Sequence, residues 1–132
     1  MQDATITLEV NENGDGTTMV SNPYTRKILG ANNTTYYGAN NSFLMRDQIK
    51  FFRSFPTANA DFNGVAKGSM KTTKDVEVLN KLGETIVAPI IIETKVSTPV
   101  GVADADFTDA YETHLALVSS TAGRDNAEDL SI

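Results

Sequence analysis

The last third of the chain, residues 85–120, most constrains its fold. An apolar run over residues 86–92 has strand character, and it leads through Pro99 and Gly101 into one helical segment, residues 104–120. Apolar side chains recur along that segment at helical spacing: Phe107, Tyr111, Leu115 and Val118. Nearly all of the preceding sequence favours strands. A lone helix after a β-rich chain needs a sheet or another subunit to cover its apolar stripe, so the sequence predicts an interleaved oligomer rather than an enzyme with a pocket.

The N-terminal residues predict a β-hairpin over residues 1–21. Turn formers fill residues 11–16, and Pro23 is expected to end the hairpin because it has no backbone N–H for a ladder. Residues 22–42 read as an irregular connection with one short strand near 34–37. The first strand alternates apolar and polar side chains, with these apolar members: Ile6, Leu8 and Val10.

Residues 34–98 predict an antiparallel sheet. A helix over residues 43–55 is possible on propensity, but the aromatic content and the neighbouring strands favour a strand there. Pro89 lies inside the last strand and implies an edge position or a bulge. We expect the main strands over residues 43–55, 61–73, 76–79 and 85–98, with a turn at 80–84.

Residues 103–132 predict a helical arm. Asp104 or Asp106 can cap its first helix, and Gly123 suits a position just after that helix ends. Residues 125–130 are expected to form one more short helical turn. The fold class is therefore α+β.

Composition limits the classes of protein to consider. The chain has 132 residues, which predicts a single domain, and without cysteine it has neither disulfides nor thiolate chemistry. No signal peptide and no membrane-spanning segment is recognised. The net charge of −6 is uneven: residues 43–82 carry seven basic and four acidic residues, whereas residues 99–132 carry seven acidic and one basic.

The sequence offers no catalytic site, metal site or cofactor site. His114 is the only histidine, and no carboxylate lies one helical turn from it. No nucleophile motif, phosphate loop or Cys/His cluster is present. Residues 11–16 faintly echo a calcium loop, but its twelfth position would be Asn22 rather than Glu, so a hairpin turn is favoured. The acidic residues near 104–109 are explained by helix capping and first-turn charge.

A basic sheet face is the one feature that suggests a ligand. If residues 43–53 and 61–73 are neighbouring antiparallel strands in matching register, one face carries Arg46, Gln48 and Lys50 beside Lys67, Ser69 and Lys71. Glu93 and Lys95 of the last strand would join them. Such a face can bind phosphates and hydrogen-bond unstacked bases. Charge alone favours the alternative, an ordinary solvated sheet face.

Three segments carry a resemblance to a known family: residues 6–16, residues 44–50, and residues 94–106 with the helix after them. The most specific piece is the helix entry Pro-Val-Gly-x-x-Asp-Ala-Asp at residues 99–106. With these segments, and over nearly its whole length, the chain resembles the coat proteins of single-stranded RNA bacteriophages, the leviviruses.

This resemblance implies an N-terminal hairpin, a five-stranded antiparallel sheet and C-terminal helices. Two subunits would interlock as a homodimer with one ten-stranded sheet, each helix packing across the partner's sheet through Phe107, Tyr111, Leu115 and Val118. Dimers would assemble into an icosahedral shell that packages genomic RNA, and a dimer would bind an RNA hairpin to repress replicase translation. The implied RNA-facing residues are Arg46, Gln48, Lys50, Lys67, Ser69, Lys71, Glu93 and Lys95. The implied contact between dimers is the loop Asn80, Lys81, Leu82, Gly83 and Glu84.

The expected role is that of a non-enzymatic capsid protein, located in the virion and assembled in the cytoplasm of the bacterial host, with no membrane partner. The alternative is a small dimeric β-sheet adaptor that binds a protein and no RNA. An enzyme is the third interpretation, and it lacks a candidate acid–base pair.

Overall fold

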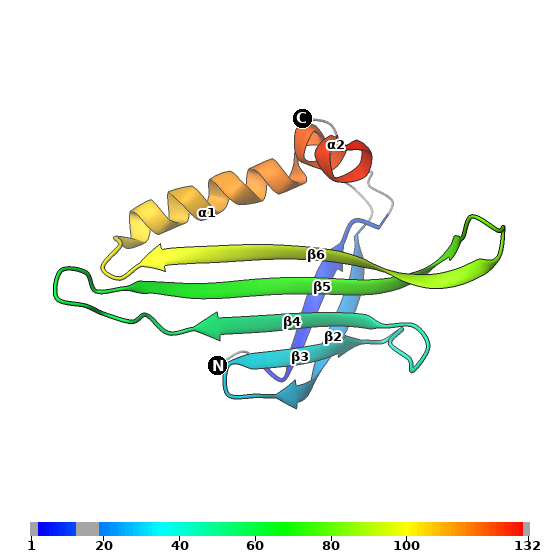
Figure 1. Ribbon diagram of the computed structural model, residues 1–132, viewed down its shortest axis with the longest axis horizontal. Coiled ribbons are helices and arrows are strands. Elements are labelled where there is room, and N and C mark those ends of the chain that lie inside the picture. Colours follow the sequence, from blue (N-terminus) through cyan, green and yellow to red (C-terminus); the bar gives the residue numbers. More distant parts are fainter. Residues whose placement is uncertain (1–2, 13–18, 131–132) are drawn as a thin grey trace. The chain divides into compact units, whose positions relative to one another are not determined.

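The computed structural model describes residues 3–12 and 19–130. Across these residues it contains six strands and two helices (Figure 1). They are β1 (Thr5–Val10), β2 (Val20–Leu29), β3 (Asn33–Gly38), β4 (Asp47–Ser54), β5 (Val65–Leu79), β6 (Thr85–Pro99), α1 (Asp104–Ser119) and α2 (Thr121–Asp129). The α+β class is confirmed. The chain divides into two compact units, one formed by Met1–Phe55 with Ala66–Ser97 and the other by Pro56–Val65 with Thr98–Ile132.

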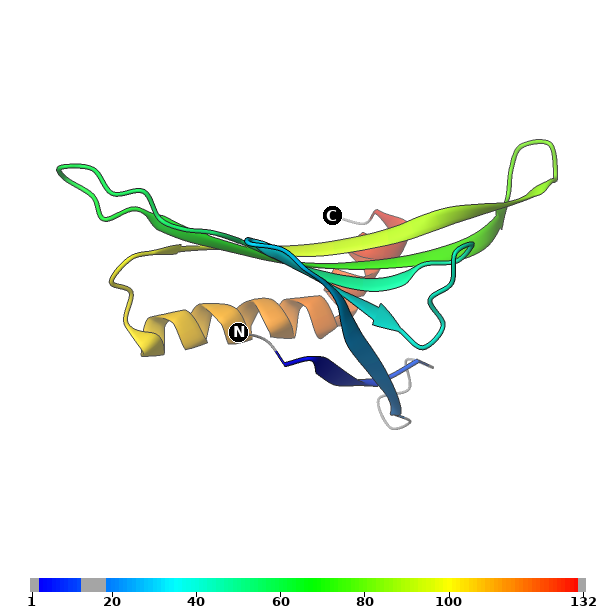
Figure 2. The same cartoon turned by 90° about the horizontal axis from the view of Figure 1, so that it is seen from below.

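The strands form a single sheet in sequence order, β1-β2-β3-β4-β5-β6. Antiparallel pairing joins each consecutive pair from β1 to β5, as expected when short turns connect neighbouring strands. The expected N-terminal hairpin is present as the antiparallel pair β1 and β2. The expected five-stranded sheet is wrong, because this hairpin is continuous with the other strands in one six-stranded sheet. The register shifts between Arg26 and Ile28 on β2, and such an irregularity bends a strand. Figure 2 shows β2 bending away from the long strands, so that β1 lies out of their plane.

Pro23 does not end the hairpin, and residues 22–29 are not irregular. The second strand runs from Val20 through Pro23 to Leu29, while the expected turn at residues 13–18 lies outside the described residues. The N–H of Arg26 donates to the carbonyl of Ala4, which makes every second pair along β1 and β2 hydrogen-bonded. Pro23, opposite Thr7, falls on a pair that is not hydrogen-bonded. Its missing N–H therefore costs the hairpin nothing.

The middle strands differ from expectation mainly at their ends. The expected short strand near residues 34–37 is β3, and the preference for a strand over a helix near residues 43–55 is confirmed by β4, although β4 begins only at Asp47. The two strands expected over 61–73 and 76–79 are one strand, β5, that begins at Val65. Gly64 precedes it with φ of +92°, and a Cβ there would lie 2.7 Å from the Thr57 carbonyl oxygen. This close approach requires glycine and ends the preceding loop.

The buried core lies on one face of the sheet, around Tyr24, Tyr36 and Ile49. The Tyr36 and Phe51 rings meet edge to face, with centroids 5.7 Å apart. The Tyr24 side chain is only 2% exposed, and its hydroxyl donates a 3.0 Å hydrogen bond to Asp47. Burial, and then this bond to a carboxylate, raise the pKa of Tyr24 to about 12. These contacts fix which side of β4 faces inward.

The two helices meet at Ser120, and their caps differ from expectation. Ala103 is the N-cap of α1 and makes no side-chain capping bond; Asp104 and Asp106 lie in the first turn, where their charge is favourable. α2 begins at Thr121, before the expected residue 125. Gly123 lies inside α2 rather than after the end of α1, and a Cβ there would clash with the Leu117 carbonyl oxygen. Neither helix of the described chain is long and apolar enough to cross a bilayer.

Candidate nucleic-acid interface

The register of β4 and β5 places the basic residues on one face of the sheet. Residues directly opposite each other in an antiparallel pair point to the same side. The opposite pairs on this face are Gln48 with Thr73, Lys50 with Lys71, Phe52 with Ser69, and Ser54 with Lys67. The core residues Ile49 and Phe51 have the other parity. The register that the sequence argument required is therefore present, and we call this surface the lysine face.

Strand β6 extends the lysine face. The N–H of Asn80 donates to the Glu84 carbonyl and closes the turn between β5 and β6. Counting inward from this turn brings Glu93 opposite Lys71 and Lys95 opposite Ser69. A hollow of about 450 Å³ confirms this proximity, since Lys67, Ser69, Glu93 and Lys95 all line it. Seven of the eight expected RNA-facing residues thus lie on β4, β5 and β6 with the same orientation.

The lysines of this face carry free charge. In the part of the chain that the structure describes, no ion pair involves the following side chains: Lys50, Lys67, Lys71 and Lys95. By contrast Lys74, which has the opposite parity on β5, lies 4.0 Å from Asp47. Four unneutralised ammonium groups on one side of a sheet favour a polyanion as the ligand.

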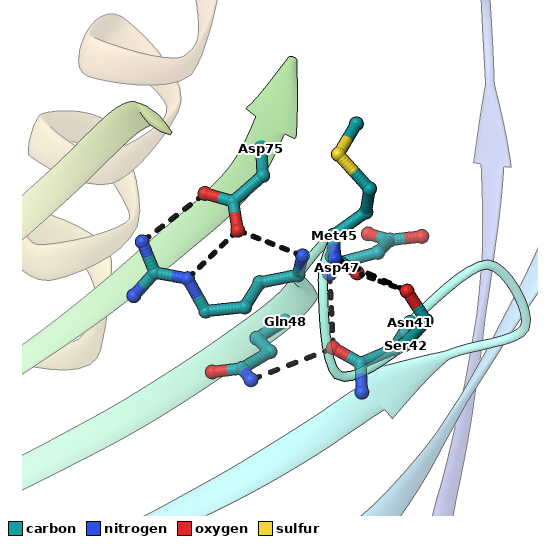
Figure 3. Close-up of polar contacts among 7 residues, drawn as sticks. Asn41, Ser42, Met45, Asp47, Gln48 and Asp75 are labelled. Carbon is teal, nitrogen blue, oxygen red and sulfur yellow. Dashed lines mark hydrogen bonds and ion pairs between the residues drawn. The ribbon is translucent and has the colours of Figure 1, made fainter. Parts of the chain in front are cut away.

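Arg46, the eighth expected residue, forms an ion pair with Asp75. Asp75 accepts hydrogen bonds from the Arg46 Nε at 3.0 Å, from its Nη2 at 3.1 Å and from its backbone N–H at 2.8 Å (Figure 3). The guanidinium and backbone bonds hold the pKa of the Asp75 carboxyl below its usual range. Arg46 therefore contributes less free charge to the lysine face than the four lysines do.

The loop before β4 is ordered by side-chain hydrogen bonds. Figure 3 shows Asn41 beside the start of β4: its Oδ1 accepts the Asp47 N–H at 3.0 Å and lies 3.4 Å from the Gln48 amide nitrogen. Ser42 Oγ accepts the Met45 N–H at 3.1 Å. These bonds fix where β4 begins and hold Gln48 at one end of the lysine face.

The expected dimer stripe lies along α1. Phe107 and Tyr111 stack with ring centroids 5.9 Å apart, and α1 has no buried residue. The four side chains remain 38–55% exposed: Phe107, Tyr111, Leu115 and Val118. Exposed apolar stripes of this kind mark interaction surfaces in proteins.

The expected contact loop between dimers is a well-defined turn. The Asn80 side-chain oxygen accepts the N–H groups of Leu82 and Glu84 at 2.9 and 3.0 Å, and Gly83 takes φ of +78°. Leu82 projects from the turn with 82% of its surface exposed. The loop thus presents one apolar side chain on a fixed backbone.

Three residues of the lysine face were not among the expected RNA-facing residues: Phe52, Ser54 and Thr73. Phe52 and Ser54 line the hollow beside Lys67, whereas Thr73 is buried. Period-two alternation along β4 puts Phe52 on the same side as Lys50, and this alternation is the sequence signal that marks it. Among the described residues no group of three potential metal ligands occurs.

Comparisons with solved structures identify the fold. The coat protein in the virus-like particle of bacteriophage AVE019 aligns with a TM-score of 0.77 and 16% identity, over 97% of this chain and 95% of that one. That of bacteriophage ESE058 gives 0.74 and 12%, over 100% and 99%, and that of Beihai levi-like virus 32 gives 0.72 and 16%, over 84% and 88%. No protein-family model and no curated protein sequence matches the chain. The chain has the fold of levi-like virus coat proteins, and the resemblance seen in its sequence is confirmed at the level of the fold.

Proposed function

We propose that the chain is the coat protein of a single-stranded RNA bacteriophage, with no enzymatic role. Its copies assemble into an icosahedral virion shell in the host cytoplasm and bind genomic RNA through the lysine face. The observation that carries this proposal is the combination of a fold found in virus-like particles with four unpaired lysines on one sheet face.

A homodimer is the proposed building block. Strand β6 is at the edge of the sheet and is 15 residues long, and a long exposed edge with apolar side chains favours pairing with another strand. Ile90, Ile91 and Ile92 are each more than half exposed on it. Pairing of β6 with the β6 of a second copy would join two sheets, and the stripe on α1 would pack on the partner. With six strands in each chain, the joined sheet would contain twelve strands rather than the expected ten.

RNA binding follows from the chemistry of the lysine face. Ammonium groups neutralise phosphates, while serine, threonine and glutamine side chains hydrogen-bond base edges. A dimer would present two such faces side by side. This arrangement suits an RNA hairpin, so the same surface would also repress replicase translation.

The first experiment examines the protein after expression in bacteria. We expect shells by negative-stain electron microscopy and an absorbance ratio at 260 and 280 nm that indicates co-purified RNA. A discrete dimer without RNA, with properties insensitive to salt, would favour the adaptor alternative. A strictly monomeric, RNA-free species would contradict the proposal.

The second experiment compares two lysines on the same strand. Lys71→Ala removes a charge from the lysine face, whereas Lys74→Ala removes the same charge from the opposite face. We expect only Lys71→Ala to weaken binding to single-stranded RNA and to reduce the slope of log K against log salt, by about 0.7 for one phosphate contact. Equal effects of the two substitutions would show that the lysine face is not the RNA surface.

A further inference from the structure

We propose that Phe52 is a stacking platform for one unpaired RNA base, and that the hollow beside it holds the nucleotide. This inference rests on the proposed RNA-binding function and assigns a residue to it. Phe52 lies on the lysine face, opposite Asn33 on β3 and Ser69 on β5. Both of these neighbours are short and polar, and the ring is 40% exposed.

The three phenylalanines around the end of β4 have different environments. Phe51 packs against Tyr36 in the core, and the Phe55 ring lies 4.9 Å from the Arg53 guanidinium. Within residues 3–12 and 19–130, neither another ring nor a cation pairs with Phe52. It is therefore the one ring of the three that is both free and on the lysine face.

The hollow beside Phe52 has the groups that a nucleotide needs. It has a volume of about 450 Å³, and its lining includes Phe52, Ser54, Lys67, Ser69, Glu93 and Lys95. The two lysines can bind phosphate oxygens. The serine hydroxyls can donate to or accept from a base or ribose, and the Glu93 carboxylate can accept an exocyclic amino group. Stacking of a base on an aromatic side chain adds binding energy without any added charge.

The test separates stacking from charge. Binding of the purified, RNA-depleted full-length chain is measured with a single-stranded RNA decamer and with an abasic ribose-phosphate strand of the same length. We expect Phe52→Leu to weaken binding of the decamer by about five- to tenfold. Its affinity for the abasic strand and its salt dependence should match those of the wild type. Phe55→Leu is the matched control and should change neither affinity.

A second variant gives a direct optical signal. The chain has no tryptophan, so Phe52→Trp introduces a single tryptophan at the platform, whose emission can be excited selectively over that of the tyrosines. Its fluorescence should be quenched by the decamer and not by the abasic strand. Unchanged decamer affinity of Phe52→Leu, or no quenching of Phe52→Trp, while the wild type binds RNA in a salt-dependent way, would overturn the role of Phe52 alone. If the wild type binds neither strand, the proposed function fails as well.

Discussion

At the scale of single residues, the ion pair between Arg46 and Asp75 ties the start of β4 to β5. We expect Asp75→Asn to destabilise the protein at pH 7, because the variant loses the charged partner of three hydrogen bonds. The folded state lowers the pKa of Asp75, so its carboxylate stabilises the fold above the unfolded pKa, about 4. That stabilisation is lost as the pH falls through the lower folded value.

Urea unfolding at several pH values and one protein concentration checks this prediction. The gap between wild type and Asp75→Asn should be widest near neutrality and should close in acid. Glu77→Gln is the control, because Glu77 is on the same strand and has no ion-pair partner among the described residues. A gap for Asp75→Asn that does not change with pH would contradict the role of the ion pair.

Tyr24 links the core to Asp47 through a hydrogen bond. Because folding raises the pKa of Tyr24, we expect the folded state to lose stability at alkaline pH. The pKa of Tyr24 is about 12 in the folded chain, against about 10 in the unfolded chain. A raised pKa stabilises the fold below the unfolded value, and this contribution is lost as the pH rises from about 10 to about 12. Tyr24→Phe should cost about 1 kcal/mol at pH 7 from the lost hydrogen bond. It should also flatten the fall of stability between pH 10 and 12, which circular dichroism during urea unfolding would detect; an equally steep fall would refute this assignment.

At this scale the sequence could predict which side chains share a face, but not which charges are free. Alternation along β4 placed Arg46, Gln48 and Lys50 together. Arg46 is nevertheless paired with Asp75, 29 residues away. Only the register of β4 against β5 brings that partner within reach, and no local pattern encodes it.

At the scale of elements, the prolines in the strands show what alternation leaves open. Period two assigns a side chain to a face, but it does not say which N–H groups are hydrogen-bonded. The bonds from Asn80 to Glu84 and from Val100 to Gly64 join hydrogen-bonded pairs just beyond the two ends of β5 and β6. Counting by two from either bond directs the nitrogen of Pro89 to the free edge, so the expected edge position is confirmed. Pro23 was misjudged because the equivalent pairing in β2 could not be inferred from sequence.

The helix α1 allows a matched test of the apolar stripe. Leu115 and Leu117 are 50% and 55% exposed, yet they are about 200° apart around the helix, and only Leu115 lies on the stripe. We expect Leu115→Glu to shift the protein toward monomer in light scattering, because a buried carboxylate is costly at an interface. Leu117→Glu should keep the wild-type mass. Wild-type assembly of both variants would exclude the stripe as the dimer contact.

At the scale of the whole molecule, the distribution of charge is more informative than the net charge. The net charge of −6 argues against a nucleic-acid ligand, but residues 99–132 carry seven acidic residues against one basic residue, and the free lysines lie on one sheet face. The sequence could predict this asymmetry and the strand–helix order. It could not predict six strands in one sheet, because residues 22–29 read as irregular in the sequence. Their pairing as β2 includes a register shift against β3.

Shell formation needs a contact beyond the dimer, and the turn at residues 80–84 is the proposed site. Its backbone is fixed by Asn80 and Gly83, so a substitution at the exposed Leu82 should leave the turn intact. We expect Leu82→Ser to retain dimers in size-exclusion chromatography while the number of shells seen by electron microscopy falls several-fold, because an apolar contact between dimers is lost. Lys81→Ser, in the same turn, is the control for a general loop effect. Shells as abundant as those of the wild type would place the contact between dimers elsewhere on the sheet edge or the helical arm.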